Sequence, residues 1–132
     1  YPDPQDLLPF FVSAASSFRF FVDRASLAVG KDGVVRYTLV VRSPQGAESV
    51  SYEGIRCSAR SYRLYATGGA GRNWSRRDAP WRDIEPRSVQ RWHNALWAEY
   101  LCPGGFPIQT AAEGADALRR GGHPRARPGE GG

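Results

Sequence analysis

The sequence predicts an α+β fold: an antiparallel meander of four to five strands over about residues 18–66, covered by one or two helices over about 86–101 and 111–120. Two observations carry this prediction. Apolar residues alternate with polar ones through the first half, which is the period of a strand with one buried face. In the second half the apolar spacing lengthens to the helical period. Strands followed by helices are typical of α+β domains.

The segment 34–42 is the clearest strand, because apolar residues hold every second position: Val35, Tyr37, Leu39 and Val41. Turn-forming residues flank it at 31–33 and 43–46. Further strands are expected from residue 18, over 48–57 and over 60–66, where the same alternation recurs.

The strand at 48–57 changes the parity of its apolar positions, from Val50 and Tyr52 to Ile55 and Cys57. Gly54 lies at the change. Since glycine adopts positive φ without steric cost, we place a β-bulge at this residue.

The first helix is predicted from Pro86, a residue suited to a first helical turn, to the Pro-Gly-Gly stop at 103–105. Its apolar stripe comprises Val89, Trp92 or His93, Leu96 and Tyr100. A second helix begins after Thr110, which forms a capping box with Glu113. Its buried side is expected to comprise Ala112, Ala115 and Leu118.

The chain of 132 residues is long enough for one hydrophobic core but too short for two. Residues 1–9 hold three prolines and are predicted to form an extended lead-in. Residues 10–120 form the single domain. Residues 121–132, rich in Gly, Pro and Arg, are predicted to be a disordered tail.

The two cysteines are predicted to form a structural disulfide, because Cys57 ends a strand and Cys102 ends the first helix. Closing this loop is worth roughly 4 kcal/mol in the chain-entropy model. A redox-active pair is the alternative, although such pairs usually have Cys-x-x-Cys spacing. The chain starts at Tyr1, contains no Met and has no apolar segment of about 20 residues. We therefore expect a periplasmic protein without a membrane span whose signal peptide has been removed, although a shortened chain would look the same.

Two stretches resemble the CNP1-like family of exported proteins of Gram-negative, mainly β-proteobacterial, bacteria. They are Ser-Leu-Ala-Val-Gly-Lys-Asp-Gly-Val-Val-Arg-Tyr-Thr-Leu-Val at 26–40 and Ser-Val-Ser-Tyr-Glu-Gly-Ile-Arg-Cys at 49–57. The resemblance extends from about Leu8 to Leu118, and the run at 52–57 is its most specific part. The resemblance implies an exported protein of a Gram-negative, mainly β-proteobacterial, lineage. The family has no established activity, so the resemblance carries over no functional residue.

Glu53 and Arg56 are the first candidate binding residues. A bulge at Gly54 would turn the carboxylate and the guanidinium to one side of the strand, where they would bind a small polar ligand or a partner. The alternative is that both face solvent, paired with each other or with Arg36.

The loop at 72–85 supplies a second set of candidate binding residues, Trp74, Arg76 and Arg77. Arginines beside aromatic rings are typical of single-stranded nucleic-acid sites. Three acidic residues in the same loop would repel phosphates, so we do not expect nucleic acid as a partner. The neighbouring Trp81 and Trp92 are explained as core residues.

No motif in the sequence indicates catalysis, a metal or a cofactor. Neither Gly-x-Ser-x-Gly nor a phosphate-binding loop is present. The two histidines, His93 and His123, form no metal-ligand spacing with the cysteines. His93 is expected at the edge of the core.

We therefore expect a non-enzymatic periplasmic binding or accessory module that acts through protein–protein contact in the cell envelope. It would use its sheet surface, the Arg/Trp loop or a strand edge. The alternatives are a small hydrolase or ligand-processing enzyme with a site built from distant residues, and a subunit of a larger envelope complex. A pocket with two carboxylates, or with Ser and His within hydrogen-bond reach, would favour the enzyme. A flat sheet face with exposed aromatics would favour the module.

Overall fold

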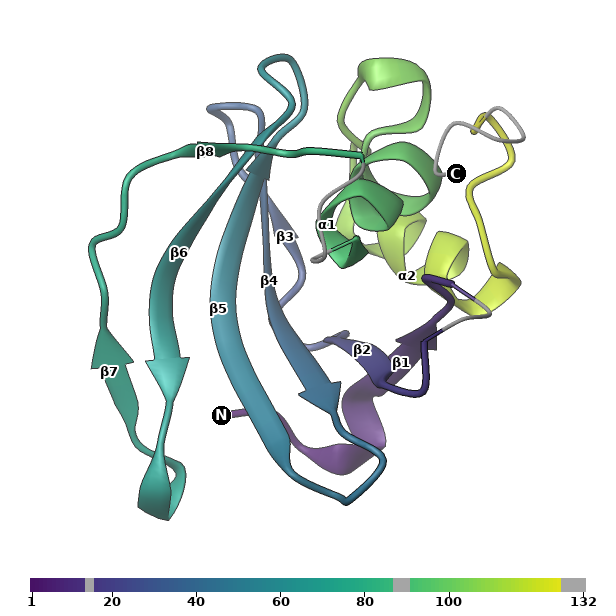
Figure 1. The fold of residues 1–132 in the computed structure, drawn as a ribbon. Helices are drawn as coiled ribbons and strands as arrows, with labels where there is room; N and C mark the ends of the chain where they lie inside the picture. The colour runs from purple at the N-terminus through teal and green to yellow at the C-terminus, as the bar shows by residue number, and fades with distance from the viewer. Residues whose placement is uncertain (14–15, 87–90, 127–132) are drawn as a thin grey trace.

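The computed structural model describes residues 1–13, 16–86 and 91–126. In these residues a curved antiparallel sheet has a layer of helices against one of its faces (Figure 1). The strand order is β1-β2-β4-β5-β6-β7, with β3 beside β4 and β8 beside β6. The α+β class is confirmed, whereas the described sheet has eight strands rather than four to five.

The strands are β1 (Leu7–Phe10), β2 (Arg19–Asp23), β3 (Ala28–Val29), β4 (Val34–Arg42), β5 (Glu48–Arg56), β6 (Ser61–Gly68), β7 (Trp74–Arg76) and β8 (Arg82–Asp83). The strands predicted at 34–42, 48–57 and 60–66 are confirmed to within two residues. The last residues of the predicted extended lead-in, 7–9, belong to strand β1. Leu7–Phe10 pairs with β2 as an edge strand, preceded by a 3-10 turn at Pro4–Asp6.

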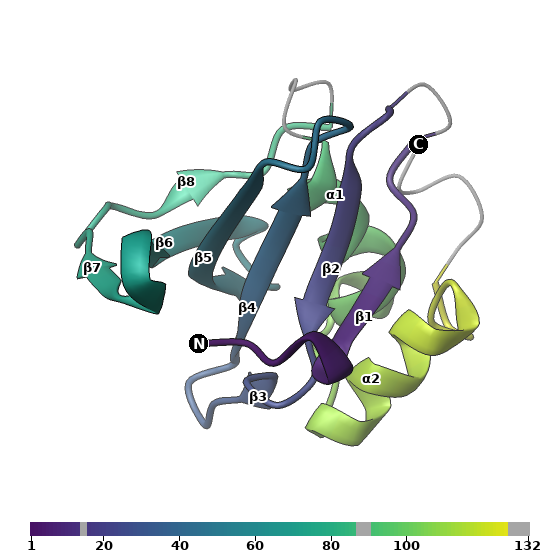
Figure 2. The ribbon, with the colours of Figure 1, turned by 90° about the horizontal axis from the view of Figure 1, so that it is seen from below.

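Strand β4 is buried on both faces. Its register with β5 is continuous, so residues of one parity share one face along its whole length. On the inner face, which we define as the face toward the helices, Val35, Tyr37 and Leu39 are buried in the main core. On the opposite, outer face, Val34, Thr38 and Val40 are also at most 3% exposed. Figure 2 shows the first residues of the chain running across this outer face from the start of β1.

The predicted bulge at Gly54 is wrong, because the irregularity lies in the neighbouring strand. Tyr52 pairs with Ala66, but Glu53 pairs with Leu64, which leaves Tyr65 of β6 as the extra residue. The apolar residues of β5 change parity for a different reason: Val50 and Tyr52 lie on the outer face, which is itself partly covered. The core of β5 remains on the odd positions throughout.

The helical layer begins at α1 (Trp92–Ala95), which continues into a π-helical turn at Leu96–Leu101 and a 3-10 turn at Pro103–Gly105. The predicted helix over 86–101 is thus confirmed from Trp92, and residues 87–90 lie outside the described residues. Leu96 and Tyr100 are buried as expected.

Helix α2 (Ala111–Arg120) has the predicted bounds and cap. Thr110 Oγ1 accepts a hydrogen bond from the Glu113 backbone N–H at 3.1 Å. The Glu113 carboxylate in turn accepts from the Gln109 backbone N–H at 2.8 Å, one residue earlier than in a standard capping box. Ala115 and Leu118 are buried, whereas Ala112 is exposed and its expected burial is wrong.

The predicted disulfide between Cys57 and Cys102 is present, with a Cα–Cα distance of 5.5 Å. It joins the end of β5 to the end of the π-helical turn. Trp97 Nε1 donates a hydrogen bond to the Cys57 carbonyl at 3.0 Å beside it. The helical layer is therefore held to the sheet by a covalent bond and a hydrogen bond at the same point.

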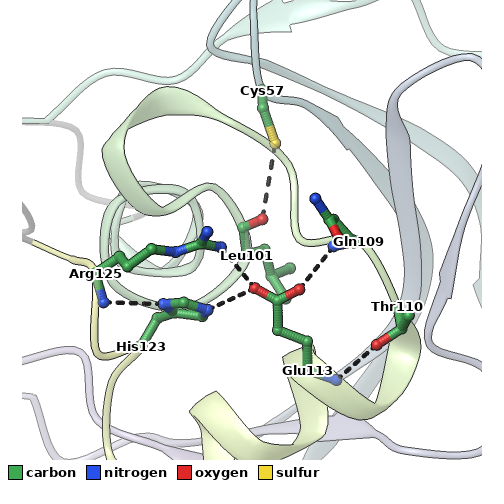
Figure 3. A network of polar contacts seen from close by, with 7 residues as sticks. All are labelled: Cys57, Leu101, Gln109, Thr110, Glu113, His123 and Arg125. Atoms are coloured by element: carbon green, nitrogen blue, oxygen red, sulfur yellow. Dashed lines mark hydrogen bonds and ion pairs between the residues drawn. The ribbon is translucent and has the colours of Figure 1, made fainter.

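The prediction of a disordered tail differs from the structure over residues 121–126. His123 is buried, its backbone N–H donates to the Glu99 carbonyl, and its Nε2 lies 2.7 Å from the Glu113 carboxylate. Arg125 reaches the same carboxylate at 2.7 Å (Figure 3). Glu113 thus anchors this segment to α2, while residues 127–132 lie outside the described residues.

Candidate functional site

An inner polar cluster forms where α1 packs on the sheet. Glu53 pairs with Tyr37 across β4 and β5, so both side chains leave the inner face. Tyr37 donates its hydroxyl hydrogen to Glu53 Oε1 at 3.0 Å, and Ser51 donates to Oε2 at 2.8 Å. His93 Nε2, from α1, lies 2.8 Å from Oε1. One carboxylate therefore gathers groups from two strands and a helix.

The side chains of His93 and Glu53 are almost fully buried, with exposures of 5% and 6%. Burial acts to raise the pKa of Glu53, but the charge of His93 and the hydrogen bonds outweigh it, so this pKa is held below its usual value. Burial and the Glu53 carboxylate raise the pKa of Tyr37 well above its usual value. Glu53 is therefore an acceptor and Tyr37 a donor at neutral pH.

An inner pocket of about 370 Å³ opens beside this cluster. Its position follows from the strand register, because Ser51 pairs with Thr67 and Tyr62 pairs with Arg82, and these pairs share the inner face. The Tyr62 ring stacks on the His93 ring with centroids 3.7 Å apart. The lining residues are Leu39, Val41, Ser49, Ser51, Glu53, Tyr62, Leu64, Thr67, Ala79, Arg82, Trp92 and His93.

An aromatic face lies on the other side of the sheet, and we define it by Tyr1, Tyr52, Tyr65 and Trp74. Neighbouring ring centroids are 5.4 Å apart for Tyr1 and Trp74, 6.5 Å for Tyr52 and Trp74, and 5.6 Å for Tyr52 and Tyr65. The Tyr1 ring lies against Gly68, where an added Cβ would come within 2.7 Å of it. Glycine at this position therefore permits the close contact.

Arginines accompany these rings. Arg36 and Arg63 lie over Tyr65, and Arg72 lies over Tyr1, with guanidinium carbons 5.3–5.7 Å from the ring centroids. A hollow of about 330 Å³ is lined by three of the rings, Tyr1, Tyr52 and Trp74, and by Asp23, Ser26, Thr38 and Ala66.

The residues selected from the sequence are divided between the two faces. Glu53 is buried on the inner face, whereas Arg56 pairs with Val34 on the outer face and stacks on Trp81 at 4.1 Å. Their predicted projection to a common side is therefore wrong, and so is the alternative that Glu53 faces solvent.

The residues selected from the Arg/Trp loop are also divided. Trp74 and Arg76 pair with Gly68 and Ala66, which places them on the outer face. Arg77 instead donates a hydrogen bond from Nε to Thr67 Oγ1 at 3.0 Å. Arg56, Trp74 and Arg76 therefore share the outer face, whereas Glu53 lies on the inner face and Arg77 contacts an inner-face residue.

Sequence reasoning missed most of the inner cluster. The sequence marks Tyr37 and Ser51 only as strand residues and places His93 at the edge of the core, whereas His93 is 4% exposed. The signal that was available is parity, because Glu53 occupies the same odd positions as Ile55. A carboxylate in the buried register of a strand requires a buried partner.

The described residues contain neither a metal-binding cluster nor a membrane-spanning helix. No group of three or more His, Cys, Asp or Glu among residues 1–13, 16–86 and 91–126 has an arrangement that would hold a metal ion. No helix in the same part of the chain is long and apolar enough to cross a membrane.

The fold and its surfaces define a class of protein: a small disulfide-linked α+β domain with a polar pocket under its helices and an aromatic face on the other side of its sheet. Such a disulfide is compatible with an exported protein. The CNP1-like family model matches residues 1–119, and the chain belongs to this family. Among curated proteins and solved structures, nothing matches it significantly.

Proposed function

We propose that the protein is a non-enzymatic binding module of the periplasm, and that its aromatic face binds an acidic segment of another envelope protein. The observation that carries this proposal is the exposure of the rings. Trp74 is 39% exposed and Tyr1 is 42% exposed on a face that the helices do not cover. Tyr, Trp and Arg are the residue types that contribute most binding energy at protein interfaces.

The charge of this face favours an acidic partner. Arg36 and Arg76 already have carboxylate partners, Asp32 and Asp78. Three other guanidiniums, those of Arg56, Arg63 and Arg72, form no ion pair within residues 1–13, 16–86 and 91–126. Arginine beside an aromatic ring suits bidentate contact with a carboxylate, because the ring orients the planar guanidinium.

Strand addition is a weaker route to the same partner. The edge strand β1 contains Pro9, which cannot donate to a ladder, and β7 has only three residues. Between β7 and β8 the edge of β6 is already occupied, because the Arg77 backbone N–H donates to the Tyr65 carbonyl at 2.9 Å. The proposed contact therefore uses side chains of the aromatic face.

The periplasm is the proposed compartment because it keeps disulfides oxidised. Cys57 and Cys102 are bonded and lie at 2% and 0% exposure, where the disulfide supports the contact between the helices and the sheet. A reducing cytoplasm would break this support.

The test is co-purification from the native envelope fraction with three tagged proteins: wild type, Trp74→Ala and Phe106→Ala. Phe106 is the matched control, because it is 76% exposed but lies outside the aromatic face. We expect the same acidic protein with wild type and Phe106→Ala, and its loss with Trp74→Ala. Equal recovery with all three proteins would overturn the proposal. Stoichiometric co-elution that resists 0.5 M salt would instead indicate a subunit of a stable complex.

A small ligand-processing enzyme is the second candidate, and the Glu53–His93 pair beside the inner pocket favours it. The pair supplies one carboxylate, that of Glu53, which contacts His93 and accepts a hydrogen bond from the Ser51 hydroxyl. Chromogenic ester hydrolysis by wild type that disappears in His93→Gln would support the enzyme. Absence of turnover by the folded wild-type protein across acyl, phosphoryl and glycosyl esters would exclude this candidate.

A further inference from the structure

We propose that the inner pocket binds a small organic acid, with the ligand carboxylate on Arg82 and its apolar body against Leu64 and Trp92. The volume of about 370 Å³ lies in the range of small-molecule sites. This site is on the opposite side of the sheet from the aromatic face and does not depend on the protein partner proposed above.

One charged side chain of the pocket lacks an ion-pair partner in the described residues, and it is positive. Glu53 is already satisfied, because Tyr37 and His93 contact Oε1 and Ser51 contacts Oε2. Arg82 also lines the pocket, but it forms no ion pair within the part of the chain that the structure describes. The available charge in the pocket is therefore positive, which selects an anion over a cation.

The strand register fixes the position of Arg82. This arginine pairs with Tyr62 in the ladder of β6 and β8, so its side chain leaves the sheet on the inner face. Burial and the Glu53 carboxylate raise the pKa of Tyr62, and Arg82 acts to lower it, which agrees with a guanidinium close to this phenol. Arg82 is thus held by the strand register at the rim of a pocket whose floor is buried.

The other residues that line the pocket are partly apolar and partly polar. Leu39, Val41 and Leu64 give it an apolar wall, and Ser49, Ser51 and Thr67 give it hydroxyls. Trp92 also lines it. A ligand that combines an apolar body with acceptor oxygens matches both kinds of surface, whereas a small inorganic anion matches only one.

The experiment is calorimetric titration of the oxidised full chain with benzoate, with neutral benzyl alcohol and with inorganic phosphate. We expect benzoate to bind, and the other two probes to bind at least about tenfold more weakly. Arg82→Gln should weaken benzoate binding by about tenfold or more. Arg119→Gln should leave it unchanged, because Arg119 is an exposed arginine on α2.

Three results would overturn this inference. They are no benzoate binding by wild type at 10 mM, equal benzoate binding by Arg82→Gln, and tighter binding of phosphate than of benzoate. Thermal melts establish that both variants fold, which is expected because both side chains are exposed. Trp74→Ala alters the aromatic face and leaves the inner pocket intact. Its benzoate affinity should therefore equal that of wild type whether or not it recovers the proposed protein partner, so the two proposals fail independently.

Discussion

The Glu53 carboxylate contacts Tyr37, Ser51 and His93 on the inner face of the sheet. Glu53 is a candidate binding residue from the sequence alone, but its partner His93 is not. His93 is 40 residues away and comes within 2.8 Å only because α1 packs on the inner face. Local patterns do not encode such a contact. They do show that Glu53 needs a buried partner, because its carboxylate lies on the same buried face as Ile55 and Tyr37 and must be hydrogen-bonded there.

Replacing Glu53 tests this pair. Glu53→Gln leaves His93 and Tyr37 with a poorer partner, so we expect the free energy of unfolding at pH 7 to fall by roughly 3 kcal/mol. The control is Glu48→Gln, whose exposed ion pair with Arg42 should matter by less than about 1 kcal/mol. Urea denaturation of both variants measures the difference, and equal losses would contradict the assigned role of the buried pair.

The same pair predicts how stability changes with pH. The pKa of Glu53 is lower in the folded than in the unfolded protein. Its contribution is therefore complete above the unfolded value of about 4.3 and is lost as the pH falls through the folded value. Urea denaturation between pH 6 and pH 3 should show a steeper loss for wild type than for Glu53→Gln. Parallel curves would contradict the lowered pKa.

Among the elements, the long periodic segments agree with the prediction, whereas the short strands β1, β7 and β8 are not predicted from the sequence. Strands β4, β5 and β6 and helix α2 have enough residues for a period, and α2 has a cap. The strands β1, β3, β7 and β8 have two to four residues each, and their pairing depends on the strands beside them. The bulge was misplaced because the parity of β5 reflected a second covered face.

Gly114 of α2 gives a prediction at this scale. Helix propensity alone says that Gly114→Ala stabilises by about 1 kcal/mol. A Cβ at this position, however, would lie 2.6 Å from Ile108 Cδ1 and 2.9 Å from Leu27 Cδ2. We therefore expect a net destabilisation of about 1–3 kcal/mol in urea denaturation.

The matched background is Ile108→Val, which removes the nearest atom. Gly114→Ala should cost less in that background than in wild type, and a double-mutant cycle measures the difference. The same cost in both backgrounds would show that the contact with Ile108 is not the cause.

For the whole molecule, the class, the disulfide and the family were predictable, because they depend on element order, on cysteines at the ends of predicted elements and on motif residues. The division of candidate residues between two faces was not predictable. It depends on the register of β4, β5 and β6 and on the extra residue Tyr65, which only the assembled sheet reveals.

The disulfide is the prediction for the whole fold. The double substitution of Cys57 and Cys102 by Ser opens a loop with a sequence separation of 45 residues. We expect a loss of about 4 kcal/mol in unfolding free energy, measured by urea denaturation against the oxidised wild type. Dithiothreitol should produce a similar loss in wild type and none in the double variant. A wild type unaffected by reduction would contradict the bracing role.

Photocrosslinking in the native envelope tests whether the aromatic face binds an acidic partner. Tyr52 or, as control, Phe106 is replaced by p-benzoylphenylalanine, and adducts formed in the native envelope are sequenced by mass spectrometry. We expect one recurrent adduct from position 52, in an acidic segment, that is absent from position 106. No adduct from position 52, or the same adducts from both positions, would contradict it.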